Sequence, residues 1–264
     1  MVKLISSDID GTLMPEGSKE MNPEIYDVIL ELKKHNIHFV VASGRQLNSE
    51  QQLFAPVKDQ ISYIAENGAI CLHEGKLHVI TEFHRDFAMK IIRELNKFPN
   101  CKVTVSSPTT QYIQGYSEEF YTYLTKHLYY NVTVIDSFEN IKEPIVKIAY
   151  LDLKTYQESL VHFRSMFEKE IGVVTAGNQW IDFIPYDSHK GTALKFILKQ
   201  RNLSPSEAIS FGDQQNDIEM LQLTEKSYAM AHARPEIKKY ATDETESVVQ
   251  TLRELIKIRT TRKM

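Results

Sequence analysis

The segment Lys3-Leu4-Ile5-Ser6-Ser7-Asp8-Ile9-Asp10-Gly11-Thr12-Leu13 carries the strongest structural signal in the chain. Its first half favours a β-strand, and Gly11 ends that strand just after two acids. Residues two positions apart on an extended backbone point the same way, so Asp8 and Asp10 can address one point in space. Two acids held so closely repel each other unless a cation or a reacting group lies between them. The segment therefore predicts a strand that delivers two carboxylates to a chemical site.

Two other structures share this pattern of letters. Asp-x-Asp-Gly suits an exposed turn, because Asp and Gly favour turns. An EF-hand calcium loop also begins Asp-x-Asp, but it needs Gly at its sixth position and Glu at its twelfth, where this chain has Leu13 and Lys19. The flanking run is also strand-like rather than helical. The calcium loop is excluded, and the turn remains the alternative to a catalytic site.

Composition limits the class of protein. A chain of 264 residues with 42% hydrophobic and 25% charged residues is typical of a soluble globular protein with one large domain or two moderate ones. A net charge of −4 gives no reason to expect a nucleic-acid partner. Two cysteines, Cys71 and Cys101, exclude a multi-disulfide framework and a Cys-cluster zinc site.

No apolar run approaches the length of a membrane span, and acids appear too early for a signal-peptide core. We expect a cytoplasmic protein without a membrane partner, either a monomer or a small homo-oligomer.

Hydrophobic periodicity divides the chain into three parts. Strands and helices alternate near both ends, which predicts a parallel sheet covered on both faces. Expected strands there are 2–9, 37–42, 61–65, 208–211 and 227–231, and expected helices are 23–35, 46–54, 192–200, 217–223 and 248–258.

Paired strands with intervening helices fill the middle of the chain, after a hairpin centred on residues 73–76. The expected strands are 103–106, 112–115, 132–135, 145–151, 173–176 and 180–184, and the expected helices 86–97, 118–128 and 155–168. The predicted fold class is α/β. Residues 1–81 and 188–264 form a Rossmann-like parallel-sheet core, and residues 82–187 form an inserted α+β domain built on an antiparallel sheet.

Three further segments place polar residues where strands end or helices begin, which is where sites form in parallel sheets. Ser43-Gly44-Arg45 follows a strand, and its hydroxyl and free N–H groups suit an anion. Lys190 stands at a helix start. Gly212 to Asp217 carries Asp213 and Asp217, a pair that suggests metal ligation or ligand orientation. A helix cap at Ser43, a surface role for Lys190 and an acidic cap at Asp217 are the alternatives.

Together the four segments resemble the motifs of the haloacid dehalogenase-like phosphatases, and most closely the Cof-type branch, which carries a large α/β cap domain. They occur in the order of that family and at a spacing that is plausible for it. Glu66-Asn67-Gly68-Ala69 is similar to the turn that precedes the cap in this branch. The core matches in residues and the cap only in placement. Ser43 stands where many relatives have Thr, and both supply a hydroxyl.

The resemblance implies a role for each matched residue. Asp8 would be the nucleophile and Asp10 the general acid/base. Mg²⁺ would be held by Asp8, the backbone carbonyl of Asp10, and Asp213. The transferring phosphate would be bound by Ser43, Lys190 and the backbone N–H groups of Ile9 and Gly44. Asn216 would help to hold the phosphate or would orient Lys190.

Other residues would support the site or touch the leaving group. Asp217 would fix its loop or pair with Lys190, and Thr12 would also support the ligands. The candidate leaving-group contacts are Arg45, Asn67, Asn178 and His189.

The predicted function is a magnesium-dependent phosphatase that hydrolyses small phosphate esters, such as sugar phosphates, through an aspartyl-phosphate. A phosphosugar mutase and a non-catalytic phospho-ligand-binding module are the alternatives.

Overall fold

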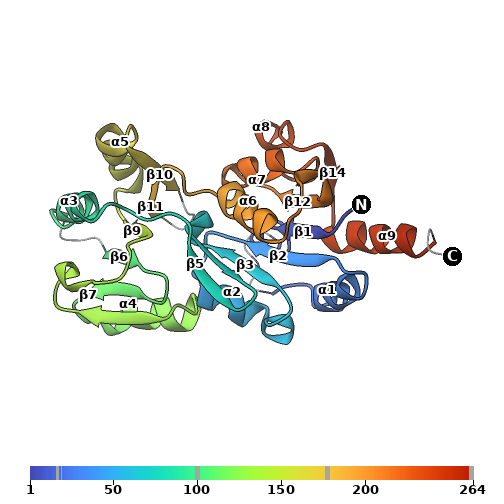
Figure 1. The fold of residues 1–264 in the computed structure, drawn as a ribbon. Coiled ribbons are helices and arrows are strands. Elements are labelled where there is room, and N and C mark those ends of the chain that lie inside the picture. The colour runs from blue at the N-terminus through green and yellow to red at the C-terminus, as the bar shows by residue number, and fades with distance from the viewer. Residues whose placement is uncertain (16–17, 19, 99–101, 176–178, 262–264) are drawn as a thin grey trace.

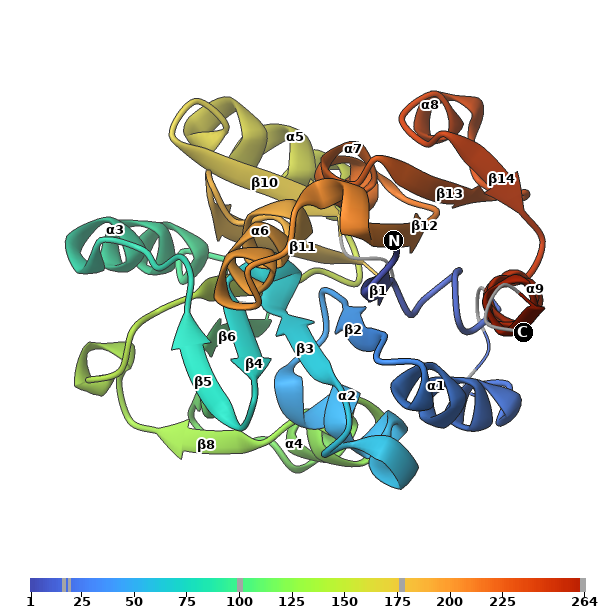
Figure 2. The same ribbon diagram turned by 45° about the vertical axis from the view of Figure 1, so that its right-hand side comes forward.

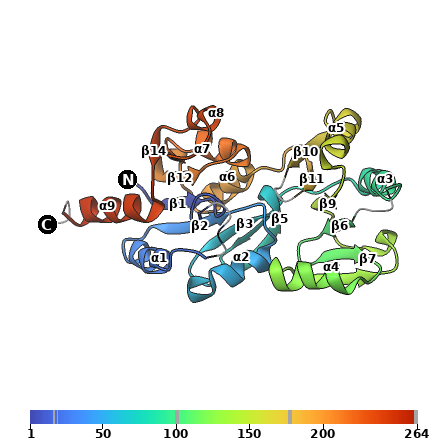
Figure 3. The same ribbon diagram turned by 180° about the vertical axis from the view of Figure 1, so that it is seen from behind.

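The computed structural model describes residues 1–261 except 16, 17, 19, 99–101 and 176–178, and these described residues form two β-sheets (Figure 1). The first sheet is built from both ends of the chain. The second is built from residues 102–185 and lies at one end of the molecule, whereas the N-terminus and the helix of residues 248–261 lie toward the other (Figure 3).

Eight strands form the first sheet in the described part of the chain. They are β1 (Leu4–Ser7), β2 (His38–Ala42), β3 (Ser62–Ala65), β4 (Ile70–His73), β5 (Lys76–Val79), β12 (Ala208–Gly212), β13 (Lys226–Met230) and β14 (Asp243–Thr245). Their order is β14-β13-β12-β1-β2-β3-β4-β5. Neighbours from β14 to β3 are parallel, and β4 and β5 add the predicted hairpin in antiparallel fashion.

Helices cover both faces of this sheet (Figure 2). They are α1 (Glu24–Lys34), α2 (Leu47–Leu53), α6 (Lys190–Gln200), α7 (Ile218–Leu223), α8 (Pro235–Lys238) and α9 (Val248–Thr261), with short helices η1 (Ala55–Val57), η2 (Glu66–Gly68), η5 (Pro205–Glu207) and η6 (Gln215–Asp217). Ile5 packs in one apolar cluster with α1 and α9, and Leu4 in another with α6 and α7. Burial on both faces explains why these strands are apolar throughout.

The second sheet has the order β10-β11-β9-β6-β7-β8. Its strands are β6 (Lys102–Ser106), β7 (Gln111–Gln114), β8 (Val132–Ile135), β9 (Lys147–Leu151), β10 (Ile171–Thr175) and β11 (Trp180–Pro185). The sequence predicts an antiparallel sheet, and this is wrong for one pair, because β7 and β8 are parallel. The helical segment between β7 and β8 is the crossover that a parallel pair requires.

Helices α3 (Arg85–Leu95) and α5 (Tyr156–Phe167) pack on one face of the second sheet, and α4 (Glu118–Thr122) packs on the other. We call the second sheet and these helices, residues 85–185, the inserted unit. The predicted helix 118–128 is wrong in part, because the α-helix ends at Thr122 and continues as the π-helix η3 (Tyr123–His127). The short helix η4 (Phe138–Asn140) follows β8.

Two short elements near the C-terminal end of the chain went unpredicted. Strand β14 and helix α8 carry no strong hydrophobic period and were not expected from the sequence. Ala176, the last residue of one predicted strand, lies outside the described residues. No helix in the described ranges combines the length and the apolar character that crossing a membrane requires.

Candidate active site

Three neighbouring strands end side by side at the centre of the first sheet. Strand β1 lies between β12 and β2, with Ser7 in register with Phe211 and Val41. Parallel strands share one carboxyl edge, so the residues that follow β1, β2 and β12 meet there. The three predicted segments at these strand ends are therefore brought together, and the start of α6 supplies the fourth.

Asp8 and Lys190 form a buried ion pair at this edge. Lys190 Nζ lies 2.5 Å from Asp8 Oδ1 and 2.6 Å from Asp217 Oδ1, and the lysine side chain is fully buried. Asp217 Oδ2 accepts hydrogen bonds from the backbone N–H groups of Asp213 and Gln214. Asp217 thus both pairs with Lys190 and fixes the loop after β12.

Asp213 faces Asp8 from that loop. Its Oδ1 accepts a hydrogen bond of 2.8 Å from Thr12 Oγ1, and its Oδ2 lies 3.6 Å from His232 Nε2. Gly11 has a φ of +92°, and a Cβ at this position would lie 2.2 Å from Asp213 Oδ2. Only glycine allows the turn after β1 to approach the second acid this closely.

The carboxylates strongly influence one another. Burial raises the pKa of Asp8 well above its usual value, and Asp217 and Asp213 add to this against the opposing effect of Lys190. Burial and Asp217 likewise raise the pKa of Asp213. Burial alone would lower the pKa of Lys190, but Asp217 and Asp8 outweigh it, so the pKa is raised and the ammonium stays charged.

These acids have the composition of a metal site. Asp8, Asp213 and Asp217 each place one carboxylate oxygen within 4.8 Å of the other two. Among the described residues, these three acids are the cluster of possible metal ligands. Asp8 Oδ2 is buried with no hydrogen-bond partner in the described structure. Both Asp217 oxygens are already engaged. A hard divalent cation between Asp8 and Asp213 would relieve the repulsion between the carboxylates and give Asp8 Oδ2 a partner.

Asp10 points away from this cluster and pairs with Arg45. Arg45 Nε donates to Asp10 Oδ2 at 2.7 Å, and Nη2 donates to Oδ1 at 2.6 Å. About half of the Asp10 side chain is exposed (48%), so it can reach a ligand from outside the cluster. Arg45, a predicted leaving-group contact, therefore lies beside the predicted acid/base. Ile9 is buried between the two acids.

The turn 43–45 is built to present its hydroxyl. Ser43 is buried, and its Oγ accepts a hydrogen bond of 3.1 Å from the Arg45 amide. Helix α2 begins only at Leu47, so Ser43 is not its N-cap. A Cβ on Gly44 would lie 2.8 Å from Asn67 Oδ1, so glycine is required for this close approach.

Helix η2 connects the remaining predicted residues. Asn216 Nδ2 donates to Asn67 Oδ1 at 3.1 Å, which links the loop after β12 to η2. A Cβ on Gly68 would lie 2.2 Å from the carbonyl oxygen of His189. The His189 side chain itself caps α6 by accepting from the Thr192 amide. Asn178, the other predicted substrate contact, lies outside the described residues.

Sequence reasoning missed several buried charges near the site. Glu50 on α2 is fully buried, and Lys147 and Asp182 are buried on β9 and β11. Their signal was a charge at an apolar position: Glu50 shares a helix face with Leu47 and Phe54, and the other two interrupt apolar strands. His232 had no recognisable signal.

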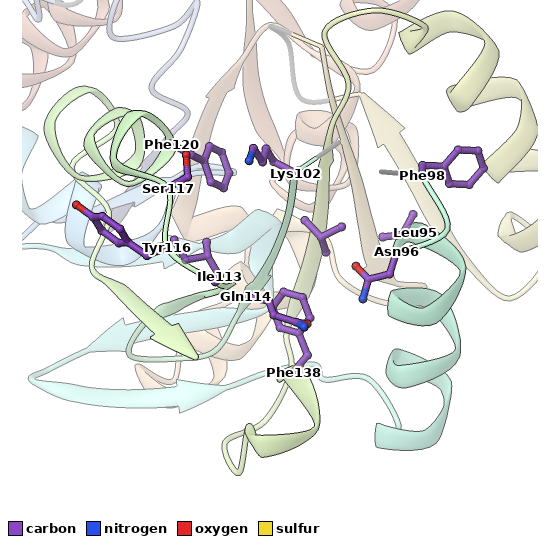
Figure 4. A pocket seen from close by; sticks show the side chains of 12 residues that line it. Leu95, Asn96, Phe98, Lys102, Ile113, Gln114, Tyr116, Ser117, Phe120 and Phe138 are labelled. Atoms are coloured by element: carbon purple, nitrogen blue, oxygen red, sulfur yellow. The ribbon is translucent and has the colours of Figure 1, made fainter. Parts of the chain in front are cut away.

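A separate cavity of about 480 Å³ lies within the inserted unit, between the end of α3 and the start of α4 (Figure 4). Asn96, Lys102, Tyr116 and Phe120 are among the side chains that line it. None of its lining residues belongs to the acidic cluster. It is not part of the candidate site.

Comparison with known proteins agrees with this geometry. A family model described as haloacid dehalogenase-like hydrolase matches residues 5–251. The 5-amino-6-(5-phospho-D-ribitylamino)uracil phosphatase YbjI of Escherichia coli is 28% identical over 237 residues, which cover 88% of this chain and 86% of that protein.

Solved structures show the same architecture. A crystal structure from Eubacterium rectale is 29% identical with a TM-score of 0.86, and the match covers 96% of this chain and 99% of the other. SMU.1108c of Streptococcus mutans is 26% identical with a TM-score of 0.81, covering 97% and 99%. The α/β fold with a parallel sheet is therefore shared with these proteins.

Proposed function

Because the chain belongs to the haloacid dehalogenase-like hydrolase family, we propose that it is a phosphatase that cleaves small phosphate monoesters with Asp8 as the nucleophile. One observation carries the proposal. Asp8 stands at the carboxyl end of the central strand, with one oxygen held by Lys190 and the other buried without a partner among the described residues. That second oxygen is the atom available to a cation or to phosphorus.

The reaction follows from two acids with separate environments. An Asp8 oxygen bonds to phosphorus while the ester P–O bond breaks, and Asp10 gives its proton to the departing alkoxide. Asp10 then takes a proton from water as the water oxygen bonds to phosphorus and the aspartyl P–O bond breaks. The products are an alcohol and inorganic phosphate. Asp10 can donate only when protonated, so its carboxyl must leave the pair with Arg45 during the cycle.

The chain's other groups stabilise the charge on the phosphoryl group. Lys190 carries a buried positive charge 2.5 Å from Asp8, and Ser43 and the Gly44 amide lie at the end of the next strand. Donors held in place in a buried site stabilise developing charge more than water does. Ile9 and Asn216 are proposed as further phosphate donors.

We propose Mg²⁺ as the cation, held by Asp8, Asp213 and the backbone carbonyl of Asp10. The donors are all oxygens, which this ion prefers. When bound, the cation supplies positive charge that lets the Asp8 carboxylate and a phosphate dianion approach each other. Thr12 and Asp217 keep the surrounding side chains in place through the hydrogen bonds described above.

The sheet face on which α4 packs becomes polar near Lys147, the residue that contacts Gly44. Ser106 and Lys147 are cross-strand neighbours on that face, and Asp182 and Gln111 share it. Buried hydroxyl, amide and charged groups suit a leaving group with several hydrogen-bonding atoms. The relative from Escherichia coli is named for a phosphorylated ribityl-aminouracil. We propose substrates of that kind, namely phosphate esters of polyols or small heterocycles.

Asp8→Asn tests the proposal. The variant should lose turnover of an aryl phosphate by about 10³-fold or more, because the amide cannot form the aspartyl-phosphate. Released phosphate and the far-UV circular dichroism spectrum would be measured together, with Asp59→Asn as the matched surface control. Near-normal turnover in folded Asp8→Asn would refute the nucleophile. Phosphate release that requires added bisphosphate would instead indicate a mutase.

A further inference from the structure

The turn 43–45 has all three of its carbonyl groups held. The Asn67 amide donates to Ser43 O at 3.1 Å, and the Glu66 amide donates to Arg45 O at 2.9 Å. The middle carbonyl, on Gly44, accepts a hydrogen bond of 3.1 Å from Lys147 Nζ. The first two donors come from η2, which connects strands β3 and β4 of the first sheet. The third comes from β9, so a residue of the inserted unit completes this turn.

The Gly44 carbonyl matters because of the peptide group to which it belongs. Its partner N–H, on Arg45, donates to Ser43 Oγ. A trans peptide is planar and its C=O and N–H point in opposite directions, so holding the carbonyl also holds the N–H. With Ser43 Oγ anchored as an acceptor, the hydroxyl proton remains available to an anion.

Lys147 is itself firmly held. Its Nζ lies 2.6 Å from Glu66 Oε2 and 3.5 Å from Asp182 Oδ2, in addition to the Gly44 contact. An ammonium has three N–H donors, and oxygens of three residues lie within 3.5 Å of this one. All three charged side chains are buried. Burial disfavours the charge of Lys147, but Asp182 and Glu66 outweigh it and raise the pKa.

The backbone of helix η2, which carries Glu66, is strained and needs neighbouring groups to hold it. Glu66, Asn67 and Gly68 have φ values of +52°, +57° and +97°, so two non-glycine residues adopt the left-handed region. Such strained backbone persists only where its surroundings hold it, and it gathers at functional sites. Lys147 holds the Glu66 side chain, and the Glu66 and Asn67 amides hold the turn 43–45.

We propose that Lys147 is a positioning residue for phosphoryl transfer, which holds the Gly44 carbonyl and Glu66 so that Ser43 and the Gly44 amide face the bound phosphate. The inference rests on the proposed function, since the anion in question is the phosphoryl group. It makes the phosphate-binding turn depend on the inserted unit, beyond any contact of that unit with the leaving group.

Lys147→Met in the full-length protein tests this. With Mg²⁺ present, the Kd for inorganic phosphate, measured by calorimetry, should rise about tenfold or more, and kcat/KM for an aryl phosphate should fall by about 10- to 100-fold. Lys147→Arg keeps the charge and should recover most of both losses. An aryl leaving group is used because it makes little demand on the polar face of the inserted unit.

Asn48→Ala is the matched control. Asn48 Nδ2 donates to the Tyr129 carbonyl, so this contact also joins α2 to the inserted unit but does not touch the turn. Its phosphate Kd should stay within about twofold of the wild type. If Lys147 only docks the inserted unit, Lys147→Met will behave like Asn48→Ala, with unchanged phosphate affinity, and the proposal is overturned.

Asp182→Asn keeps the test valid if Lys147→Met does not fold. Asp182 contacts Lys147 but not the turn 43–45. The variant should raise the phosphate Kd about threefold or more, because the Lys147 ammonium loses one of the groups that hold it in place. An unchanged Kd overturns the proposal. If the wild-type protein hydrolyses esters and both variants have its phosphate Kd, only the role proposed for Lys147 is refuted. If the wild-type protein neither binds phosphate nor hydrolyses any ester, the proposed function is refuted.

Discussion

Asp8 shows how the environment of one residue sets its chemistry. Burial and two neighbouring acids favour its protonated form, while Lys190 at 2.5 Å favours the carboxylate. A nucleophile must be ionised, so the balance has to be tipped by more positive charge. Asp213 lies where it can bring that charge as a bound cation. Asp10, paired with Arg45 and half exposed, lies outside this cluster.

Asp213→Ala should therefore abolish specific Mg²⁺ binding. Calorimetry should show the Kd for Mg²⁺ raised about tenfold or more, because one of two side-chain ligands is lost. Mg²⁺ should raise the Tm of the wild type but not that of the variant, since ligand binding to the folded state alone stabilises it. Asp59→Ala, at an exposed position, is the control. Equal Mg²⁺ affinity in Asp213→Ala would remove this residue from the ligands.

Glu50 predicts a pH effect on stability. Burial, then Glu66, raises the pKa of this carboxyl well above 4.5, and neither of its oxygens has a hydrogen-bond partner in the described structure. The folded state thus binds the proton more tightly than the unfolded state does. Stability from this group is present below pH 4.5 and is lost as pH rises through the raised pKa.

Glu50→Gln should accordingly be more stable than the wild type at pH 8, by about 1–3 kcal/mol, and nearly equal to it at pH 4.5. Urea unfolding at the two pH values measures the difference. Glu225→Gln, at an exposed position, should show no such trend. A gain that is the same at both pH values would mean that burial of the charge is not the cause.

At the scale of elements, sequence patterns predicted the structure where it depends only on residues close together in the chain. The β4–β5 hairpin turns at Glu74 and Gly75, with φ values of +50° and +74°, as the pattern His73-Glu74-Gly75-Lys76 predicts. The helix that begins at Glu118 was predicted to run to Leu128, but it widens into a π-helix at Tyr123. Its side chains pack against β9 and β11, contacts that local periodicity does not contain.

Gly75→Ala isolates the backbone requirement of the hairpin. A Cβ at this position meets no atom within 4 Å, so only the positive φ penalises it. Alanine should lower the free energy of unfolding by about 1 kcal/mol. Gly75→Asn should cost clearly less, because asparagine tolerates the left-handed region. Urea unfolding of both variants tests this, and equal losses would contradict the explanation.

At the scale of the whole molecule, the two sheets have largely separate cores. The main clusters that pack on the second sheet draw on residues 83–183, and those of the first sheet on residues up to 80 and after 192. A small cluster formed by Ala65, Ala69, Ile70 and Val146 joins them. Polar contacts also join the two parts, among them those of Gln46 with Asn131 and of Lys147 with Glu66.

Residues 82–187 should therefore fold when expressed alone. Their core comes from within the segment, and the buried charges Lys147 and Asp182 would become hydrated. Circular dichroism with urea titration should show one cooperative transition, and amide signals should be well dispersed by NMR. A non-cooperative transition would show that the first sheet is needed for this fold.

The strands, most helices and the four chemical segments could be predicted because their signals are local. Apolar periodicity, a glycine after Asp8 and polar residues at strand ends depend on neighbours in the chain. The reaction class followed from the same segments, and the family match agrees with it.

Contacts across the molecule decided the rest. The Asp10–Arg45 pair joins residues 35 positions apart, and the hydrogen bond from Lys147 to Gly44 joins residues 103 positions apart. The burial of Glu50, whose oxygens have no hydrogen-bond partner in the described structure, likewise depends on tertiary packing. A buried charge looks like any other charge in the sequence. Its partners, and hence its effect, exist only once the desolvating core has formed around it.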